Sequence, residues 1–339
     1  MVAISIGSLD LWSIIVSIGL FLLGMHLLEQ GLQGIGSKSL KQFLQAQTNS
    51  PLKGVFTGTV VTAFLQSSSL VGPIVLAFVG AGMLEMRNAL GVILGSNLGT
   101  TVTGWMLAVL GFKLDLAKFY QPLVAVGAFV TVFLPAGHRP YYLGNLVLGL
   151  GLLLMGLGTL ITSLENLVPQ LDTTILRGQG LLVYCLIGAV LTALVQSSSV
   201  VMMVILSALY AGVITVNEAI PVAIGSNVGT TSTVLLGALD GLVEKRRVAY
   251  AHLIFNLTTA IVALLCLPIF VYIIRNMFGI TDPLFMLVVF HSLFNLLGIG
   301  LFLPLLDPFI VLLNWMAPER NAGLFATAYI HKVPSTVPD

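Results

Sequence analysis

Two identical groups of polar residues are the part of this chain best suited to chemistry. The string Gln-Ser-Ser-Ser occurs at Gln66–Ser69 and again at Gln196–Ser199, each inside an otherwise apolar stretch. Serine hydroxyls and glutamine amides can donate hydrogen bonds to an oxyanion or lend oxygen atoms to a cation. A second polar string, Gly-Ser-Asn-x-Gly-Thr-Thr, follows each copy, at Gly95–Thr101 and Gly225–Thr231. The alternative is that these hydroxyls only bond helix carbonyls, but the doubled arrangement favours a binding site.

An internal repeat relates the two copies. Residues 58–111 align with 188–241 at a constant offset of 130 without a gap, and 23 of the 54 aligned positions are identical. The segments ahead of them also match at an offset of 132, where Gly19–Leu23 resembles Gly151–Met155. The chain is therefore a duplicated unit, which we place at 11–135 and 144–275.

The composition indicates a membrane protein. Hydrophobic residues make up 57% and charged residues 8% of 339 residues, too little polar surface for a water-soluble globule. Five apolar stretches are long enough, or nearly so, for a helix that crosses the lipid bilayer. They lie at 11–28, 119–135, 144–165, 249–274 and 284–313. We therefore expect an all-α polytopic membrane protein with a last transmembrane helix at 284–313 and a polar cytoplasmic tail at 314–339.

Charge and cysteine content exclude several other classes. A net charge of +1 gives no basis for a nucleic-acid partner. Cys185 and Cys266 both lie in apolar segments, which favours packing over a disulfide or a transition-metal site.

The segments around the polar strings are too short to cross the bilayer. Each Gln-Ser-Ser-Ser string lies between two apolar arms of about 13 residues, or about 20 Å of helix, which predicts a re-entrant helical hairpin with a polar tip. The glycines and asparagine of the second string suit an unwound turn, which predicts a discontinuous helix in each half. Interrupted segments at matching places in two halves are typical of a transporter binding site.

The predicted topology determines how the second half is oriented in the membrane relative to the first. A half with one leading helix, one broken helix and one trailing helix crosses the membrane an odd number of times, so the second half has inverted topology. Most of the lysine and arginine residues then fall on one side, which the charge bias of membrane proteins names cytoplasmic. We expect a multi-pass protein of the cell inner (plasma) membrane with an external N-terminus and a cytoplasmic C-terminus.

The two kinds of string can serve two kinds of ion. The arm after each tip begins a helix whose free N–H groups and partial positive charge attract an anion. The arm before each tip ends in unpaired carbonyls, which with Asn97, Thr100, Asn227 and Thr230 could coordinate Na⁺. Neither pair of strings contains Lys, Arg, Asp or Glu, so a bound cation would stabilise a bound oxyanion.

The strings resemble those of a known family. Thr62–Ser69 and Thr192–Ser199, each followed by the Gly-Ser-Asn string, are similar to the type II sodium-dependent phosphate cotransporters, including bacterial members. The resemblance covers about 11–313 and implies a symporter, not an enzyme. It implies that inward Na⁺ flow drives uptake of inorganic phosphate by alternating access, with Na⁺ as the co-transported ion and no other cofactor.

The resemblance also implies the residues that contact each ion. The expected phosphate ligands are Ser67, Ser68, Ser69, Ser197, Ser198 and Ser199. The expected sodium ligands are Gln66, Asn97, Thr100, Thr101, Gln196, Asn227, Thr230 and Thr231.

Two further strings, His252–Asn256 and His291–Asn295, look like the His-x-x-Phe-Asn helices of the family. We place each histidine near a helix start and expect a structural hydrogen bond, with gating or proton sensitivity as the alternative. Some animal members carry an Asp after the first histidine, linked to an extra sodium; here Leu253 stands there, so that site is not expected. We expect no PhoU-like regulatory domain in this chain, and we expect Glu29 to be interfacial.

Two other functions stay open. An ion or anion channel could be built on the same inverted repeats, with glycine-rich breaks and Ser/Thr oxygens as its filter. A serine hydrolase using Ser68 or Ser198 with His252 is weaker, because no nucleophile elbow or orienting carboxylate accompanies the serines. A homodimer is compatible with the sequence.

Overall fold

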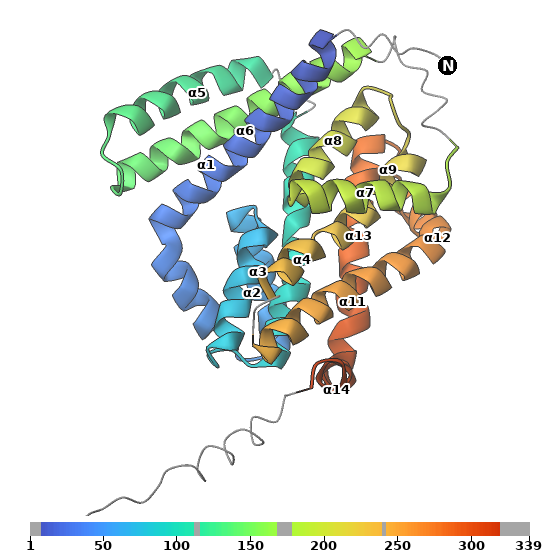
Figure 1. The fold of residues 1–339 in the computed structure, drawn as a ribbon. Helices are drawn as coiled ribbons and strands as arrows, with labels where there is room; N and C mark the ends of the chain where they lie inside the picture. The colour runs from blue at the N-terminus through green and yellow to red at the C-terminus, as the bar shows by residue number, and fades with distance from the viewer. Residues whose placement is uncertain (1–7, 112–115, 168–177, 239–241, 319–339) are drawn as a thin grey trace, which may run out of the picture.

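The protein is helical throughout the part that the structure describes. The computed structural model describes residues 8–111, 116–167, 178–238 and 242–318, and no strand occurs among them (Figure 1). The first half contains α1 (Ser8–Ala46), α2 (Pro51–Leu65), α3 (Ser68–Gly80), α4 (Met86–Met106), the π-helical turn η1 (Leu107–Gly111) and α5 (Leu116–Phe133). The second half contains α6 (Arg139–Leu167), α7 (Leu181–Val195), α8 (Ser198–Tyr210), α9 (Val216–Gly229), α10 (Thr231–Ala238), α11 (Val243–Leu265), α12 (Leu267–Tyr272) and the π-helical turn η4 (Ile273–Met277). It is followed by α13 (Pro283–Phe302), the 3₁₀ turn η5 (Leu303–Leu305) and α14 (Leu306–Met316).

Seven helical stretches in the described residues are long and apolar enough to cross a membrane. The all-α, multi-pass prediction is therefore confirmed. The four helices that flank the Gln-Ser-Ser-Ser strings are shorter, with 15 residues in α2 and α7 and 13 in α3 and α8. The tail predicted at 314–339 begins inside α14, and its residues from 319 onward lie outside the described residues.

Three long helices form a layer on one side of the molecule. α1 packs along α6, and α5 packs along the other side of α6 (Figure 1). Close approach between α1 and α6 depends on small residues, since a Cβ on Gly24 would lie 2.7 Å from the Gly149 carbonyl oxygen and closer still to the α6 backbone at Leu153. α1 is much longer than its predicted apolar core at 11–28, and its second half reaches the helices that carry the first tip.

The glycine-rich strings are not unwound, which corrects the prediction of two discontinuous helices. α4 runs through Gly95–Thr101 as continuous helix, and in the second half only Thr230, itself in a right-handed helical conformation, separates α9 from α10. The physical reason is packing. A Cβ on Gly95 would overlap the Val55 carbonyl oxygen of α2, so this glycine allows contact between backbones and not a turn.

The two halves repeat this packing residue for residue. A Cβ on Gly225 of α9 would overlap the Cys185 carbonyl oxygen of α7, and both residues lie 130 positions after their counterparts Gly95 and Val55. Each helix that precedes a tip is thus held against the helix that carries the second polar string.

The last apolar stretch, predicted as one helix at 284–313, is bent. α13 ends at Phe302, the 3₁₀ turn η5 contains Pro304, and α14 leaves in another direction, so that it is seen end-on in Figure 1. Proline removes a helical hydrogen bond and clashes with the preceding turn, which explains the bend.

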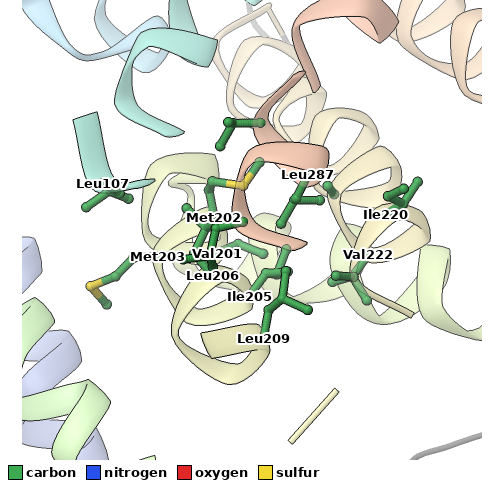
Figure 2. Close-up of a cluster of buried hydrophobic side chains, with 14 of the residues drawn as sticks. Leu107, Val201, Met202, Met203, Ile205, Leu206, Leu209, Ile220, Val222 and Leu287 are labelled. Atoms are coloured by element: carbon green, nitrogen blue, oxygen red, sulfur yellow. The ribbon is translucent and has the colours of Figure 1, made fainter. Parts of the chain in front are cut away.

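A tightly packed apolar cluster surrounds α8, the helix that follows the second tip. Side chains of α8 contact α9 and α13, and Leu107 of η1 lies on another side of the cluster (Figure 2). The labelled members from α8 are Val201, Met202, Met203, Ile205, Leu206 and Leu209, and those from α9 and α13 are Ile220, Val222 and Leu287. This cluster fixes the position of α8 and so of the serines at its start.

Candidate ion-binding cavity

The two Gln-Ser-Ser-Ser strings form matching tips between short helices. Gln66 and Gln196 have φ values of 56° and 55°, and they are the only non-glycine residues with positive φ among those described. A left-handed residue ends one helix and redirects the chain into the next. The following helices begin at Ser68 and Ser198. The polar tips expected from the sequence are therefore present.

The two tips meet at one cavity of about 190 Å³. Its lining comes from α1, both tips, α10 and α11. The lining residues are Leu22, Met25, His26, Glu29, Gln66, Ser67, Ser68, Ser69, Val195, Gln196, Ser197, Ser198, Ser199, Thr230, Thr233, Val234 and His252. All six serines predicted to bind phosphate thus surround a single space.

A hydrogen-bonded chain links the tips across the two halves. The Thr103 hydroxyl of α4 donates to Gln66 Oε1 at 2.8 Å, and the Ser199 hydroxyl donates to the same threonine oxygen at 3.4 Å. Within the first tip, the Ser67 and Ser69 hydroxyls lie 2.9 Å apart. Thr103 was not among the predicted ligands.

Each Gly-Ser-Asn string is joined to a buried histidine and a second buried asparagine on another helix, which for the first string is α11 of the second half. Asn97 Nδ2 donates to Asn256 Oδ1 at 2.7 Å, and His252 Nε2 lies 3.3 Å from Asn97 Oδ1. The histidine side chain is 4% exposed. It lies in the middle of α11, which corrects the prediction of a position near a helix start.

The second Gly-Ser-Asn string has the equivalent set, which joins α9 of the second half to α13. Asn227 Nδ2 donates to Asn295 Oδ1 at 2.9 Å, and His291 Nε2 lies 3.1 Å from Asn227 Oδ1. His291 is also 4% exposed and lies well inside α13. The structural hydrogen bond expected for each histidine is confirmed, and the pairing joins each second polar string to one His-x-x-Phe-Asn helix.

The predicted sodium ligands separate into two groups. Gln66, Gln196 and Thr230 line the cavity. The other five do not line it, namely Asn97, Thr100, Thr101, Asn227 and Thr231. Their threonine hydroxyls donate to carbonyls of their own helices, as Thr100 does to Asn97 at 2.6 Å, which leaves the hydroxyl lone pairs free to accept.

The structure adds two ionisable groups to the cavity lining, Glu29 and His26 of α1. Ser67 of the first tip lines the same cavity. The prediction that Glu29 is interfacial is therefore wrong. The signal was available, since Leu22, Met25 and Glu29 share one face of a helix.

The local electrostatics suit an anion despite the lack of fixed positive charge. No lysine or arginine is among the described residues that line the cavity. The N-termini of α3 and α8 both lie at its wall, at Ser67–Ser69 and Ser197–Ser199. Helix N-termini carry unpaired N–H groups and a partial positive charge.

Spanning-length apolar helices around a polar internal cavity define the class as a polytopic membrane protein of the transporter type. The family follows from residues 20–162 and 174–302, which match the family model described as Na+/Pi-cotransporter. The chain belongs to this family, whose members transport phosphate and are not enzymes.

Three relatives illustrate the range of the family. YqeW of Bacillus subtilis is 32% identical over 308 residues, which cover 88% of this chain and 96% of YqeW. YjbB of Escherichia coli, named as a candidate inorganic phosphate export protein, is 28% identical over 88% of this chain, which spans about half (54%) of YjbB. Sodium-dependent phosphate transport protein 2A of Ovis aries is 30% identical over 135 residues, 38% of this chain and 21% of that protein. No solved structure matches the chain.

Proposed function

We propose that this protein is a secondary active transporter that couples inward sodium flow to uptake of inorganic phosphate by alternating access. The observation that carries the proposal is the meeting of both Gln-Ser-Ser-Ser tips at one cavity, linked through Thr103. Residues from two halves of a duplicated chain enclose one small polar space, as a single substrate site between repeats requires.

Phosphate is the proposed occupant of the space between the tips. The hydroxyls of Ser67–Ser69 and Ser197–Ser199 would donate to its oxygens, together with the N–H groups at the starts of α3 and α8. The absence of a lysine or arginine from the cavity lining supports a second role for sodium, whose positive charge would offset that of the anion.

Sodium is proposed to bind beside phosphate. Gln66, Gln196 and Thr230 offer amide or hydroxyl oxygens at the cavity wall. Asn97, Thr100, Thr101, Asn227 and Thr231 lie behind it, so they are proposed to contact a sodium ion that binds deeper, beside α4 and α9. The accepting lone pairs of the threonines suit such a role.

The membrane arrangement is part of the proposal. We place α2–α3 and α7–α8 as re-entrant hairpins in repeats of inverted topology, at 11–135 and 144–275, followed by the crossing helix at 284–313. The repeated Gly95–Val55 and Gly225–Cys185 contacts support two equivalent units. The charge bias supports an external N-terminus and a cytoplasmic C-terminus in the plasma membrane.

The test is uptake of labelled phosphate into vesicles that contain the purified full chain. An inward Na⁺ gradient should drive phosphate above its equilibrium level, and replacement of Na⁺ by K⁺ should abolish this accumulation. Equal accumulation in Na⁺ and K⁺ would overturn the coupling. Accumulation only under an outward Na⁺ gradient would correct the direction to export while leaving the coupling in place.

Substitutions locate the site in the same assay. Ser68→Ala and Ser198→Ala each remove a cavity hydroxyl and should raise the phosphate concentration for half-maximal uptake about tenfold. Ser232→Ala is the matched control, because this serine bonds the Gly229 carbonyl and does not line the cavity. Wild-type kinetics in both tip variants would remove phosphate from this cavity.

A further inference from the structure

Glu29 is the one carboxylate among the described residues that line the cavity. It lies on α1, on the helix face that also carries Leu22 and Met25, and its side chain is partly buried. Ser67 of the first tip lines the same cavity, and His26 lies one turn earlier on the same helix. A negative group therefore lies beside the serines that are proposed to hold phosphate.

A carboxylate beside an oxyanion is unfavourable unless something positive lies between them. Among the described residues that line the cavity, no lysine or arginine offsets the charge. Two negative charges at close range repel strongly where water is scarce. A proton on one of the two partners converts the repulsion into a charge-assisted hydrogen bond, which is short and strong.

Phosphate can supply that proton, whereas sulfate cannot. Near neutral pH phosphate keeps at least one P–OH group, and sulfate, of the same shape and size, keeps none. An ionised carboxylate can only accept hydrogen bonds. It therefore attracts the protonated oxygen of phosphate and repels every oxygen of sulfate. The repulsion of sulfate is what creates the selectivity.

We propose that Glu29 accepts a hydrogen bond from the protonated oxygen of phosphate and so makes the cavity selective for protonated tetrahedral oxyanions over sulfate. The inference rests on the proposed function, namely that phosphate binds between the tips. In this arrangement the serines and helix N-termini donate hydrogen bonds to the unprotonated oxygens. Glu29 accepts the hydrogen bond that a protonated oxygen donates.

The asymmetry of the repeat agrees with a single acceptor. At the offset of 132 that relates the leading helices, Ile161 of α6 is the counterpart of Glu29. No residue of α6 contributes to the described lining of the cavity. The donor groups are duplicated by the two tips, but a carboxylate acceptor is present once among the described lining residues.

The experiment measures competition by sulfate and arsenate against labelled phosphate, with the purified full chain in saturating NaCl. Glu29→Gln keeps the shape of the side chain but removes its charge and adds an N–H donor. The ratio of the sulfate to the phosphate inhibition constant should fall about tenfold or more. Arsenate, which is protonated as phosphate is, should compete well with both proteins.

Two variants control for other effects of the change. Glu165→Gln makes the same change at an exposed carboxylate of α6 outside this cavity and should keep the wild-type ratio. Glu29→Asp keeps the carboxylate and should keep the preference for phosphate. Loss of the preference in Glu29→Asp would contradict the proposal.

Three other results would also overturn it. A Glu29→Gln protein that retains the wild-type ratio rules out the hydrogen bond, and one that binds neither anion contradicts it, because the donors of the tips remain. An unchanged ratio with at least a tenfold higher sodium requirement would assign Glu29 to a cation instead. Failure of the wild-type protein to bind phosphate at all would instead reject the proposed function on which the inference depends.

Discussion

The two Gln-Ser-Ser-Ser tips have the same sequence and the same backbone but different surroundings. Ser67 and Ser197 have φ values of −147° and −146°, and both preceding glutamines are left-handed. Gln66 is nevertheless buried and bonded to Thr103, whereas Gln196 is exposed and no hydrogen bond of its side chain is found among the described residues. Identical strings thus encode identical turns, and the neighbouring helices decide what each turn contacts.

The leading helices also differ. α1 supplies four residues to the cavity wall, while its counterpart α6 supplies none. The two Gly-Ser-Asn strings nevertheless have equivalent partners, as the Asn97–His252 and Asn227–His291 pairs demonstrate. Under the proposed alternating access, a site with one covered tip and one open tip is what one of the two end states would look like. The helix contacts and Asn–His pairs around the tips, which we call the support, are therefore symmetric, whereas the residues that line the cavity are not.

The largest expected effect tests the symmetric support. Gly95→Leu and Gly225→Leu each place a bulky side chain where the facing backbone lies, so each should lower the free energy of unfolding by about 3 kcal/mol or more. Thermal melting in detergent measures this. Gly19→Leu is the control, since nothing lies within 4 Å of a Cβ at that position. A clear loss in only one of the two halves would break the equivalence of the support.

A smaller and again equal effect is expected for the buried asparagines. Asn97→Ala and Asn227→Ala each remove the partner of a buried histidine Nε2 and of a buried asparagine Oδ1, so each should cost about 2 kcal/mol. Chemical unfolding of the two variants compares them directly, with the exposed Asn276→Ala as control. Costs that differ by more than about 1 kcal/mol would argue against equivalent sets.

The smallest expected effect tests the asymmetry of the tips. Gln66→Ala removes a buried acceptor from Thr103 and should cost about 1 kcal/mol of stability. Gln196→Ala changes an exposed side chain and should cost less than about 0.5 kcal/mol. The melting temperatures of the pair give the answer. If Gln196→Ala were as costly as Gln66→Ala, the two tips would have the same surroundings.

Much of this fold could be predicted from the sequence because it depends on length and local conformation. The short arms around Gln66 and Gln196, the polar tips and the leading helices all follow from apolar lengths and the repeat offset. The glycine strings could not be predicted in the same way. Gly95 is compatible with an unwound turn and with a close helix contact, and only the position of Val55 on another helix decides between them.

The candidate site was only partly predictable from the repeat. The six serines were found through their duplication, and they do surround one cavity. Glu29 was missed because it lies on a helix outside the aligned segment 58–111 and has no acidic counterpart. Thr103 was missed although it repeats as Thr233, because its role depends on contacts with two distant segments. The repeat identifies candidate residues, and tertiary packing decides which of them reach the site.

Reciprocal binding of phosphate and sodium tests the central claim most directly. Equilibrium binding of labelled phosphate to the purified chain, measured in NaCl and in KCl of the same ionic strength, reports it without vesicles or gradients. We predict saturable binding that is at least tenfold tighter in NaCl and is weakened in Ser68→Ala and Ser198→Ala. Equal affinity in the two salts, or wild-type affinity in both serine variants, would contradict a shared phosphate and sodium site between the tips.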